Sequence, residues 1–259
     1  MYFSHAQTLE WSRAVADICA AHPAVAAGLV EFFVTPSYPA IPAVLEIMKG
    51  GITVGAQDIS AEQFGAFTGE VSGAELYELG CRVVEVGHAE RRHLYSETDE
   101  VVAAKTRAAL RSGLTPIVCI GEDQPMGLAS AVSECGRQVR SALATARAAG
   151  EHGRVIFAYE PNWAIGADQP ADPSYIREIC QGIREQLDED ADFPDSDLIY
   201  GGSAGPGLLP QVSSAVSGLF LGRFAHDPNA VALILDEVCE LAEDSARRAD
   251  VAPARDSAV

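Results

Sequence analysis

Two residues have the type and position that proton transfer at carbon requires. Glu160 ends the apolar run that begins at Val155 and is followed by Pro161, so its carboxylate would emerge beside apolar side chains. Partial removal from water raises the basicity of a carboxylate, which suits abstraction of a proton from the carbon next to a carbonyl. His88 follows the run Val83–Gly87 and precedes a short helical turn, whose N–H groups favour a neutral ring. Such a ring can donate a hydrogen bond to the oxyanion that forms.

The segment after Glu160 has the composition of a moving lid. It begins with Pro161 and Trp163, has small residues at 164–167 and ends at Ala171. Rigid ends around a small-residue tip are typical of loops that close over an active site and exclude water.

No metal or cofactor site is indicated. His88 and His93 are five residues apart, off a common helical face, and no further His or Cys stands at ligand spacing. We therefore expect chemistry without a metal and without a cofactor, and we expect the histidines other than His88 to be structural.

The sequence predicts alternating strands and helices, which would hold Glu160 and His88 in position. Short β-branched or apolar runs alternate with Ala-rich segments of helical period, as in parallel sheets with crossover helices. The predicted strands are Val30–Thr35, Thr53–Gln57, Arg82–Gly87, Thr115–Ile120, Val155–Glu160, Leu198–Tyr200 and Gly218–Gly222. The predicted helices are Leu9–Ala21, Ile41–Lys49, Ser72–Leu79, Asp99–Ser112, Gly127–Ala149, Pro173–Asp188, Pro206–Ser213 and Pro228–Glu243. The pattern predicts an α/β fold, a (β/α)₈ barrel, whose site lies at the carboxyl ends of the strands.

The two ends of the chain depart from a complete barrel. The helix Leu9–Ala21 has no strand before it, whereas a closed barrel needs eight strands. Seven strands would leave two edges unpaired, so we expect about ten further residues upstream of Met1 that form the first strand. We assign residues 1–243 to the barrel domain and expect residues 244–259 to form a disordered tail, because they contain no large apolar side chain.

Composition restricts the partners and the compartment. The net charge of −19 would repel nucleic acid and anionic membranes, so a phosphorylated ligand must be held by local positive potential. The six cysteines are scattered without a CxxC pair, and no apolar segment is long enough to span a membrane. We expect a cytoplasmic protein with reduced thiols that binds neither nucleic acid nor membrane.

The segments that follow the predicted strands carry uncommon motifs. In chain order they read TPSYPA, GAQDISAEQFGAFTGE, GHAERRHLYSETDE, CIGE, YEPNWAIG and YGGS. This series resembles the triosephosphate isomerase family along nearly the whole chain, with one motif for each barrel unit. The resemblance implies aldose–ketose isomerisation of a small sugar phosphate without a cofactor, with Glu160 as the base and His88 as the electrophile. This pairing is a known example of acid and base tuning in this family.

The resemblance also implies roles for the surrounding residues. The backbone N–H of Gly166 at the lid tip would bind phosphate, with Ser203 and Gly222 as further phosphate donors, and Tyr200 would latch the closed lid. Glu90 is either a supporting catalytic residue or a structural one, and the neighbouring arginines are expected to be structural. A loop around Thr68 would insert into a second subunit and make a homodimer.

Several positions depart from the family pattern. The family's substrate-binding lysine would fall immediately before Met1, and its absence would remove the main positive charge for the substrate. Arg223 stands where the family has a second phosphate-binding glycine and could contact phosphate or reshape the pocket. Ala89 replaces a serine after the histidine, and Asp168 replaces a lid glycine.

These departures cluster where substrate length and phosphate position are sensed, which favours the same chemistry on a different ligand. The segments GGSAGPGLL and FLGRFAHD resemble a branch that isomerises four-carbon ketose phosphates, such as erythrulose phosphate, in erythritol catabolism. The alternative substrate is triose phosphate, the pair of glycolysis. An alternative of another class is a non-catalytic barrel that binds a phosphorylated metabolite.

Overall fold

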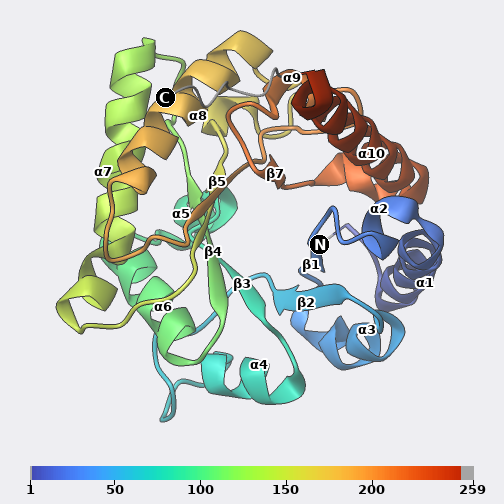
Figure 1. The fold of residues 1–259 in the computed structure, drawn as a ribbon. Coiled ribbons are helices and arrows are strands. Elements are labelled where there is room, and N and C mark those ends of the chain that lie inside the picture. The colour runs from blue at the N-terminus through green and yellow to red at the C-terminus, as the bar shows by residue number, and fades with distance from the viewer. Residues whose placement is uncertain (1, 252–259) are drawn as a thin grey trace, which may run out of the picture.

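One parallel sheet of seven strands organises residues 2–251, which are the part of the chain that the computed structural model describes. The strands are β1 (Phe32–Val34), β2 (Ile52–Ala56), β3 (Val83–Val86), β4 (Thr115–Ile120), β5 (Ile156–Tyr159), β6 (Asp197–Tyr200) and β7 (Gly218–Leu219). Each strand pairs in parallel with the next strand along the chain. The sheet curls, and the helices lie around its outside (Figure 1). All seven predicted strands are therefore confirmed, with ends that differ by no more than three residues.

All eight predicted helices are confirmed, and the described residues form two further short helices. They are α1 (His5–Ala21), α2 (Pro23–Ala26), α3 (Ile41–Ile47), α4 (Gly73–Leu79), α5 (Ala89–Tyr95), α6 (Asp99–Arg111), α7 (Leu128–Ala148), α8 (Pro173–Asp188), α9 (Leu209–Val212) and α10 (Pro228–Val251), with 3-10 turns η1 (Tyr38–Ala40), η2 (Asn162–Ala164) and η3 (Arg223–His226). Local signals set several helix starts. The side chains of Ser72 and Thr98 accept hydrogen bonds from the first turns of α4 and α6, and Pro173 begins α8.

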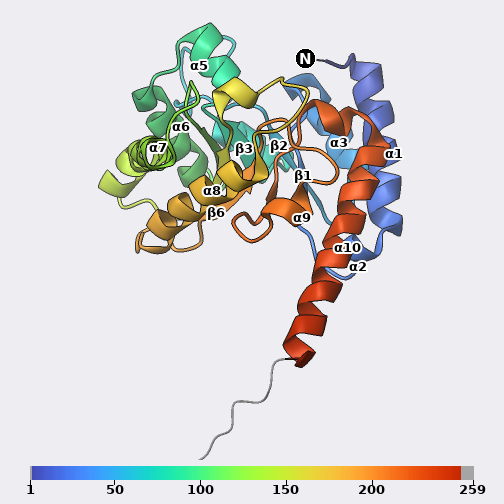
Figure 2. The same ribbon diagram turned by 90° about the horizontal axis from the view of Figure 1, so that it is seen from above.

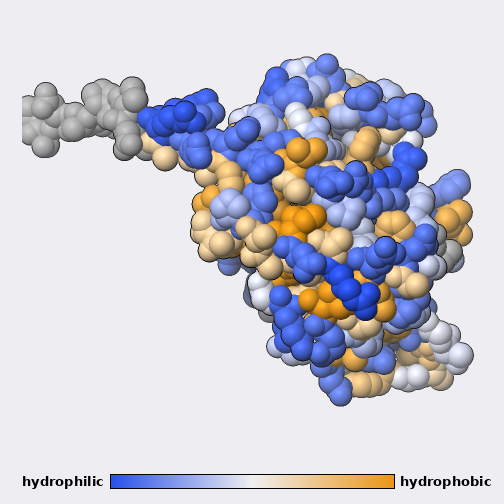
Figure 3. Space-filling view, turned by 90° about the vertical axis from the view of Figure 1, so that its right-hand side faces the viewer, coloured by the Kyte–Doolittle hydropathy of each residue, from blue (hydrophilic) through white to orange (hydrophobic). Residues whose placement is uncertain are grey.

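Helix α10 differs from the prediction at its carboxyl end. We expected disorder from residue 244, but the helix continues to Val251; residues 252–259 lie outside the described part. Arg247 forms ion pairs with Glu243 and Asp244 on the same helix, and alanine and arginine have high helix propensity, so this turn needs no burial. The end of α10 projects beyond the other helices (Figure 2), and its surface is hydrophilic (Figure 3).

Side chains alternate between the two faces of the sheet and fill two kinds of core. The inner face carries a small apolar cluster made of Val83, Ile117, Cys119, Ile156, Ala158 and Ile199. On the outer face, a large cluster packs β2–β6 against α4 and α6–α9, and a second one packs β1 and β2 against α1, α3 and α10. This double coverage makes the strands rigid supports for the loops at their carboxyl ends.

The sheet has the strand order of a (β/α)₈ barrel with seven of its strands. Within residues 2–251, β1 and β7 each pair with one strand only and not with each other. The strand expected before α1 would precede this sequence and stays a prediction. Among the described helices, none is both long and apolar enough to cross a membrane.

Candidate active site

The carboxyl ends of the strands bring together residues that are far apart in the sequence. His88 follows β3, Glu160 follows β5, Ser203 follows β6 and Arg223 begins the turn after β7. The Nε2 atom of His88 lies 3.8 Å from the Oε2 atom of Glu160. Glu160 and His88 thus lie close together at the carboxyl ends of the strands.

Glu160 is held in a dry and crowded position. Its exposed fraction is 6%, and its Oε2 atom has no hydrogen-bond partner among the described residues. Burial raises the pKa of the Glu160 carboxyl above its ordinary value. A Cβ atom at Gly121 would overlap the Glu160 carbonyl oxygen, and one at Gly201 would overlap its carboxylate. Gly121 of CIGE and Gly201 of YGGS therefore make room for Glu160.

The orientation of the His88 ring is fixed by helix α5. Its Nδ1 atom accepts a hydrogen bond of 3.2 Å from the backbone N–H of Glu90, so the ring caps the helix. A nitrogen that accepts a hydrogen bond carries no proton, so this geometry corresponds to a neutral ring with its hydrogen on Nε2. That hydrogen points to the side of the ring where Glu160 lies.

Glu90 lies at the other side of the ring. Its Oε2 atom is 3.9 Å from His88 Nδ1, and its side chain is 64% exposed. The carboxylate of Glu90 is thus next to the nitrogen that faces away from Glu160.

A buried ionic network supports the segment after His88. Lys105 donates to Asp58 at 2.7 and 2.8 Å and to Glu97 at 2.6 Å. Arg91 contacts the same two carboxylates, at 2.9 Å to Asp58 and 2.7 Å to Glu97. Each charge has an opposite partner, as buried ions require, and the network ties α5 and α6 to the loop after β2.

The segment after Glu160, which the sequence predicts to be a lid, is anchored where it begins. The indole of Trp163 donates to Glu122 Oε1 at 3.0 Å, and the hydroxyls of Tyr159 and Tyr175 donate to the same carboxylate. Pro161 is buried directly before η2. Glu122 is the glutamate of CIGE, so this motif holds the start of the lid.

The end and the tip of the lid contact the loops after β6 and β7. The N–H of Ala171 donates to the Tyr200 hydroxyl at 3.3 Å, and that hydroxyl donates to Gly202 O at 2.8 Å. The Ser203 hydroxyl lies within 2.8 Å of Ala164 O and 3.0 Å of Ala167 O. The Tyr200 hydroxyl thus joins Ala171 to the loop after β6, and its role as a latch stays a prediction.

Positive charge is present at the lid tip. Gly166 has a φ of 78°, and a Cβ atom there would lie 3.6 Å from the Arg223 guanidinium. Arg223 follows the exposed Gly222 and forms no ion pair among the described residues. An unpaired guanidinium beside backbone N–H groups can bind a phosphate.

Our sequence analysis did not single out two acidic residues at the site, Glu122 and Glu85. Glu122 had a signal, because its position in CIGE is part of a motif that follows a strand. Glu85 lies inside β3 and is 8% exposed. Its signal is a single acid inside an otherwise apolar run, which is unusual for a buried parallel strand.

A parallel barrel with a buried carboxylate facing a neutral imidazole at the strand ends defines a class of enzymes that transfer protons at carbon. The family model described as triosephosphate isomerase matches residues 1–238, and the chain belongs to this family. It is an isomerase, so the alternative of a non-catalytic barrel is not supported.

The curated relatives carry two different activities in their names. The L-erythrulose-1-phosphate isomerase of Pectobacterium atrosepticum is 47% identical over 246 residues, which cover 95% of each chain. The triosephosphate isomerase of Alkalilimnicola ehrlichii is 38% identical over 85% of this chain and 88% of its own. That of Cutibacterium acnes is 39% identical over 74% of this chain and 77% of its own.

Proposed function

We propose that the chain isomerises a four-carbon ketose phosphate such as erythrulose phosphate, with Glu160 as the base and His88 as the electrophile. The observation that carries the chemistry is the 3.8 Å separation between His88 Nε2 and Glu160 Oε2. A substrate placed between them would lose a carbon-bound proton to Glu160 while its carbonyl oxygen accepts a hydrogen bond from His88. Glu160 then returns the proton to the neighbouring carbon.

The preference for four carbons rests on the relatives and on two residues. The relative named for erythrulose 1-phosphate has the higher identity and coverage of the three compared. Arg223 adds a cation where phosphate would bind, and Ala89 leaves space beside His88 because it lacks a hydroxyl. Triose phosphate, interconverted between dihydroxyacetone phosphate and glyceraldehyde 3-phosphate, is the second candidate.

Chemistry determines the product on the favoured substrate. Erythrulose 1-phosphate has its carbonyl at C2 and a hydroxyl on C3. Removal of the C3 proton gives an enediolate, and return of the proton to C2 moves the carbonyl to C3. The product is then a second ketose phosphate, whereas the same step on dihydroxyacetone phosphate gives an aldose.

The remaining residues of the site have proposed roles in binding. Phosphate would lie under the lid tip, between the Gly166 backbone, Ser203, Gly222 and the Arg223 guanidinium. Glu90 would act indirectly, because its backbone N–H holds the His88 ring.

The test is isomerase activity of the purified natural protein on erythrulose 1-phosphate and dihydroxyacetone phosphate, measured side by side. A higher kcat/KM on the four-carbon substrate supports the proposal. A higher kcat/KM on the triose would assign the chain to glycolysis, and the four-carbon assignment would be wrong.

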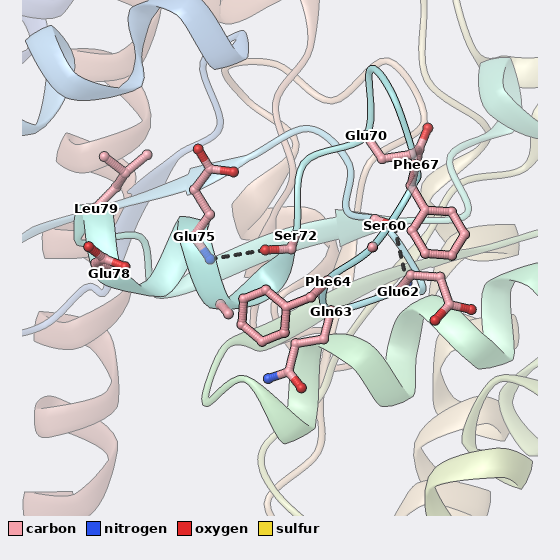
Figure 4. Close-up of a pocket in the computed structure, with 12 residues that line it drawn as sticks. Ser60, Glu62, Gln63, Phe64, Phe67, Glu70, Ser72, Glu75, Glu78 and Leu79 are labelled. Carbon is pink, nitrogen blue, oxygen red and sulfur yellow. Dashed lines mark hydrogen bonds between the residues drawn. The ribbon is translucent and has the colours of Figure 1, made fainter.

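We propose a homodimer assembled through the loop after β2. Phe64 is 79% exposed and Phe67 is 45% exposed, although both are large and apolar. They stand at a groove of about 550 Å³ between this loop and α4 (Figure 4). Burial of both rings in a second copy would remove this apolar surface from water and bring Thr68 near the partner's active site. A comparison of the sedimentation of the wild type with that of Phe64→Asp would test the dimer.

A cytoplasmic setting and a role in carbohydrate catabolism complete the proposal. All six cysteines are free, as expected where thiols stay reduced. A four-carbon preference would place the enzyme in the breakdown of erythritol-type sugars.

A further inference from the structure

The inner face of β3 carries a buried carboxyl that the proposed mechanism does not use. Val84 and Val86 point to the outer core, and Val83 points to the inner cluster. By alternation, Glu85 also points inward, three residues before His88. Burial of an acid at such a position costs free energy unless a polar partner compensates it.

The described residues offer Glu85 little compensation. Its Oε1 atom lies 4.0 Å from His88 Nε2, and its hydrogen bond comes from the weak donor Cys119, with Sγ at 3.9 Å. Burial, together with the carboxylates of Glu160 and Asp58, raises the pKa of Glu85 well above its ordinary value. This environment favours the protonated carboxyl, which has an O–H to donate.

The position of Glu85 in the barrel indicates which end of a bound substrate it would face. The groups proposed for phosphate follow β5, β6 and β7, whereas Glu85 and Cys119 belong to β3 and β4. A sugar phosphate held at Arg223 and reacting between Glu160 and His88 therefore has its non-phosphorylated end toward β3 and β4.

Cys119, which contacts Glu85, also lines a cavity of about 230 Å³ together with Ala89, Glu160 and charged residues of α5, α6 and α7; Glu85 and His88 are not among its lining residues.

We propose that Glu85 is a specificity residue whose O–H donates a hydrogen bond to the terminal hydroxyl of the four-carbon substrate. The inference rests on the proposed function and adds the group that would read the fourth carbon. A triose phosphate lacks that hydroxymethyl group, so the hydrogen bond would distinguish the two substrates.

The test compares kcat/KM on erythrulose 1-phosphate and on dihydroxyacetone phosphate for wild type, Glu85→Leu and Glu85→Gln. Leucine has no donor, so the ratio of the two kcat/KM values should fall by about 10- to 100-fold. Glutamine keeps a neutral donor, so its ratio should stay within about 3-fold of wild type. Ile117→Val is the matched control, because Ile117 stands opposite Glu85 on β4 and its ratio should not change.

A pH series separates a direct contact from a structural role. The wild-type ratio should fall as pH rises through the pKa of Glu85, because the ionised carboxyl cannot donate. The ratio of the glutamine variant should stay constant. Titration of the surrounding groups cancels in the ratio because they meet both substrates; these groups are His88, Glu160, Cys119, Asp58 and Glu90.

The outcomes are distinguishable. If wild type prefers the triose, the proposed four-carbon function fails, and the role of Glu85 fails with it. If wild type prefers four carbons but Glu85→Leu loses activity equally on both substrates, only the role of Glu85 is overturned. Thermal melting checks that the leucine variant folds, and Glu85→Met replaces it if it does not.

Discussion

The Nε2 atom of His88 faces Oε2 of Glu160 across 3.8 Å, while the opposite ring nitrogen accepts a hydrogen bond from the backbone of helix α5. The hydrogen bond orients the ring, and the barrel strands β3 and β5 set the spacing. Because Glu160 Oε2 has no other partner among the described residues, this oxygen is available to a substrate.

Burial of Glu160 predicts a stability cost that depends on pH. A raised folded-state pKa means that the folded protein binds the proton more tightly than the unfolded chain does. Ionised Glu160 therefore destabilises the fold above its folded-state pKa, and this effect disappears below the ordinary value of 4.5. Glu160→Gln should raise the free energy of unfolding at pH 8 by about 1 kcal/mol, and the gain should shrink toward pH 4.

Urea denaturation at the two pH values measures this difference. Glu46→Gln is the control, since Glu46 forms an exposed pair with Lys49 and should change stability by less than about 0.5 kcal/mol. A glutamine variant of Glu160 that is less stable than wild type at pH 8 would contradict the expected desolvation.

If Tyr200 latches the lid, removal of its hydroxyl should lower kcat/KM. In Tyr200→Phe, the N–H of Ala171 loses its acceptor and Gly202 O loses its donor. We expect kcat/KM to fall roughly 10-fold because the lid end is held less well. Steady-state kinetics measure the effect, with Tyr77→Phe on the exposed face of α4 as the control. Equal kinetics for both variants would exclude a latch.

Replacement of Gly201 should lower kcat because the Glu160 carboxylate lies beside it. A methyl group there would overlap the Glu160 carboxylate and displace it by about 1 Å, which can lower kcat about 100-fold. Gly127→Ala is the matched control, because a Cβ at Gly127 meets no atom within 4 Å. If Gly201→Ala kept wild-type kcat, the carboxylate position in the structure would not be the working one.

Arg223 should contribute to substrate binding through phosphate. Removal of its guanidinium in Arg223→Ala should raise KM roughly 10-fold, and the sensitivity of KM to salt should decrease. Arg247→Ala on the projecting end of α10 serves as the control for charge loss, since that side chain is 70% exposed. An unchanged KM for Arg223→Ala would mean that this side chain points away from the ligand.

The agreement between sequence and structure has clear physical limits. Strands such as Thr115–Ile120 were predictable because buried parallel strands consist of continuous β-branched and apolar residues. The positions of His88 and Glu160 followed, because side chains after parallel strands gather at one end of a barrel. The pairing of Lys105 with Asp58 was not predictable, because residues 47 positions apart meet only through the packing of α6 on the sheet.

The misjudged end of α10 has a different cause. The absence of large apolar residues after position 243 argues against burial, but it does not argue against a helix. Exposed Ala, Arg and Glu residues support a helix through intrinsic propensity and ion pairs between neighbouring turns.

The central claim is that Glu160 moves a carbon-bound proton of a sugar phosphate. Nuclear magnetic resonance of erythrulose 1-phosphate in D₂O tests it directly, because an enediolate formed by Glu160 picks up solvent deuterium. We predict that wild type replaces the C3 proton by deuterium and that Glu160→Asp slows this exchange about 100-fold or more, with little change in KM. Exchange at the wild-type rate in Glu160→Asp would contradict Glu160 as the base.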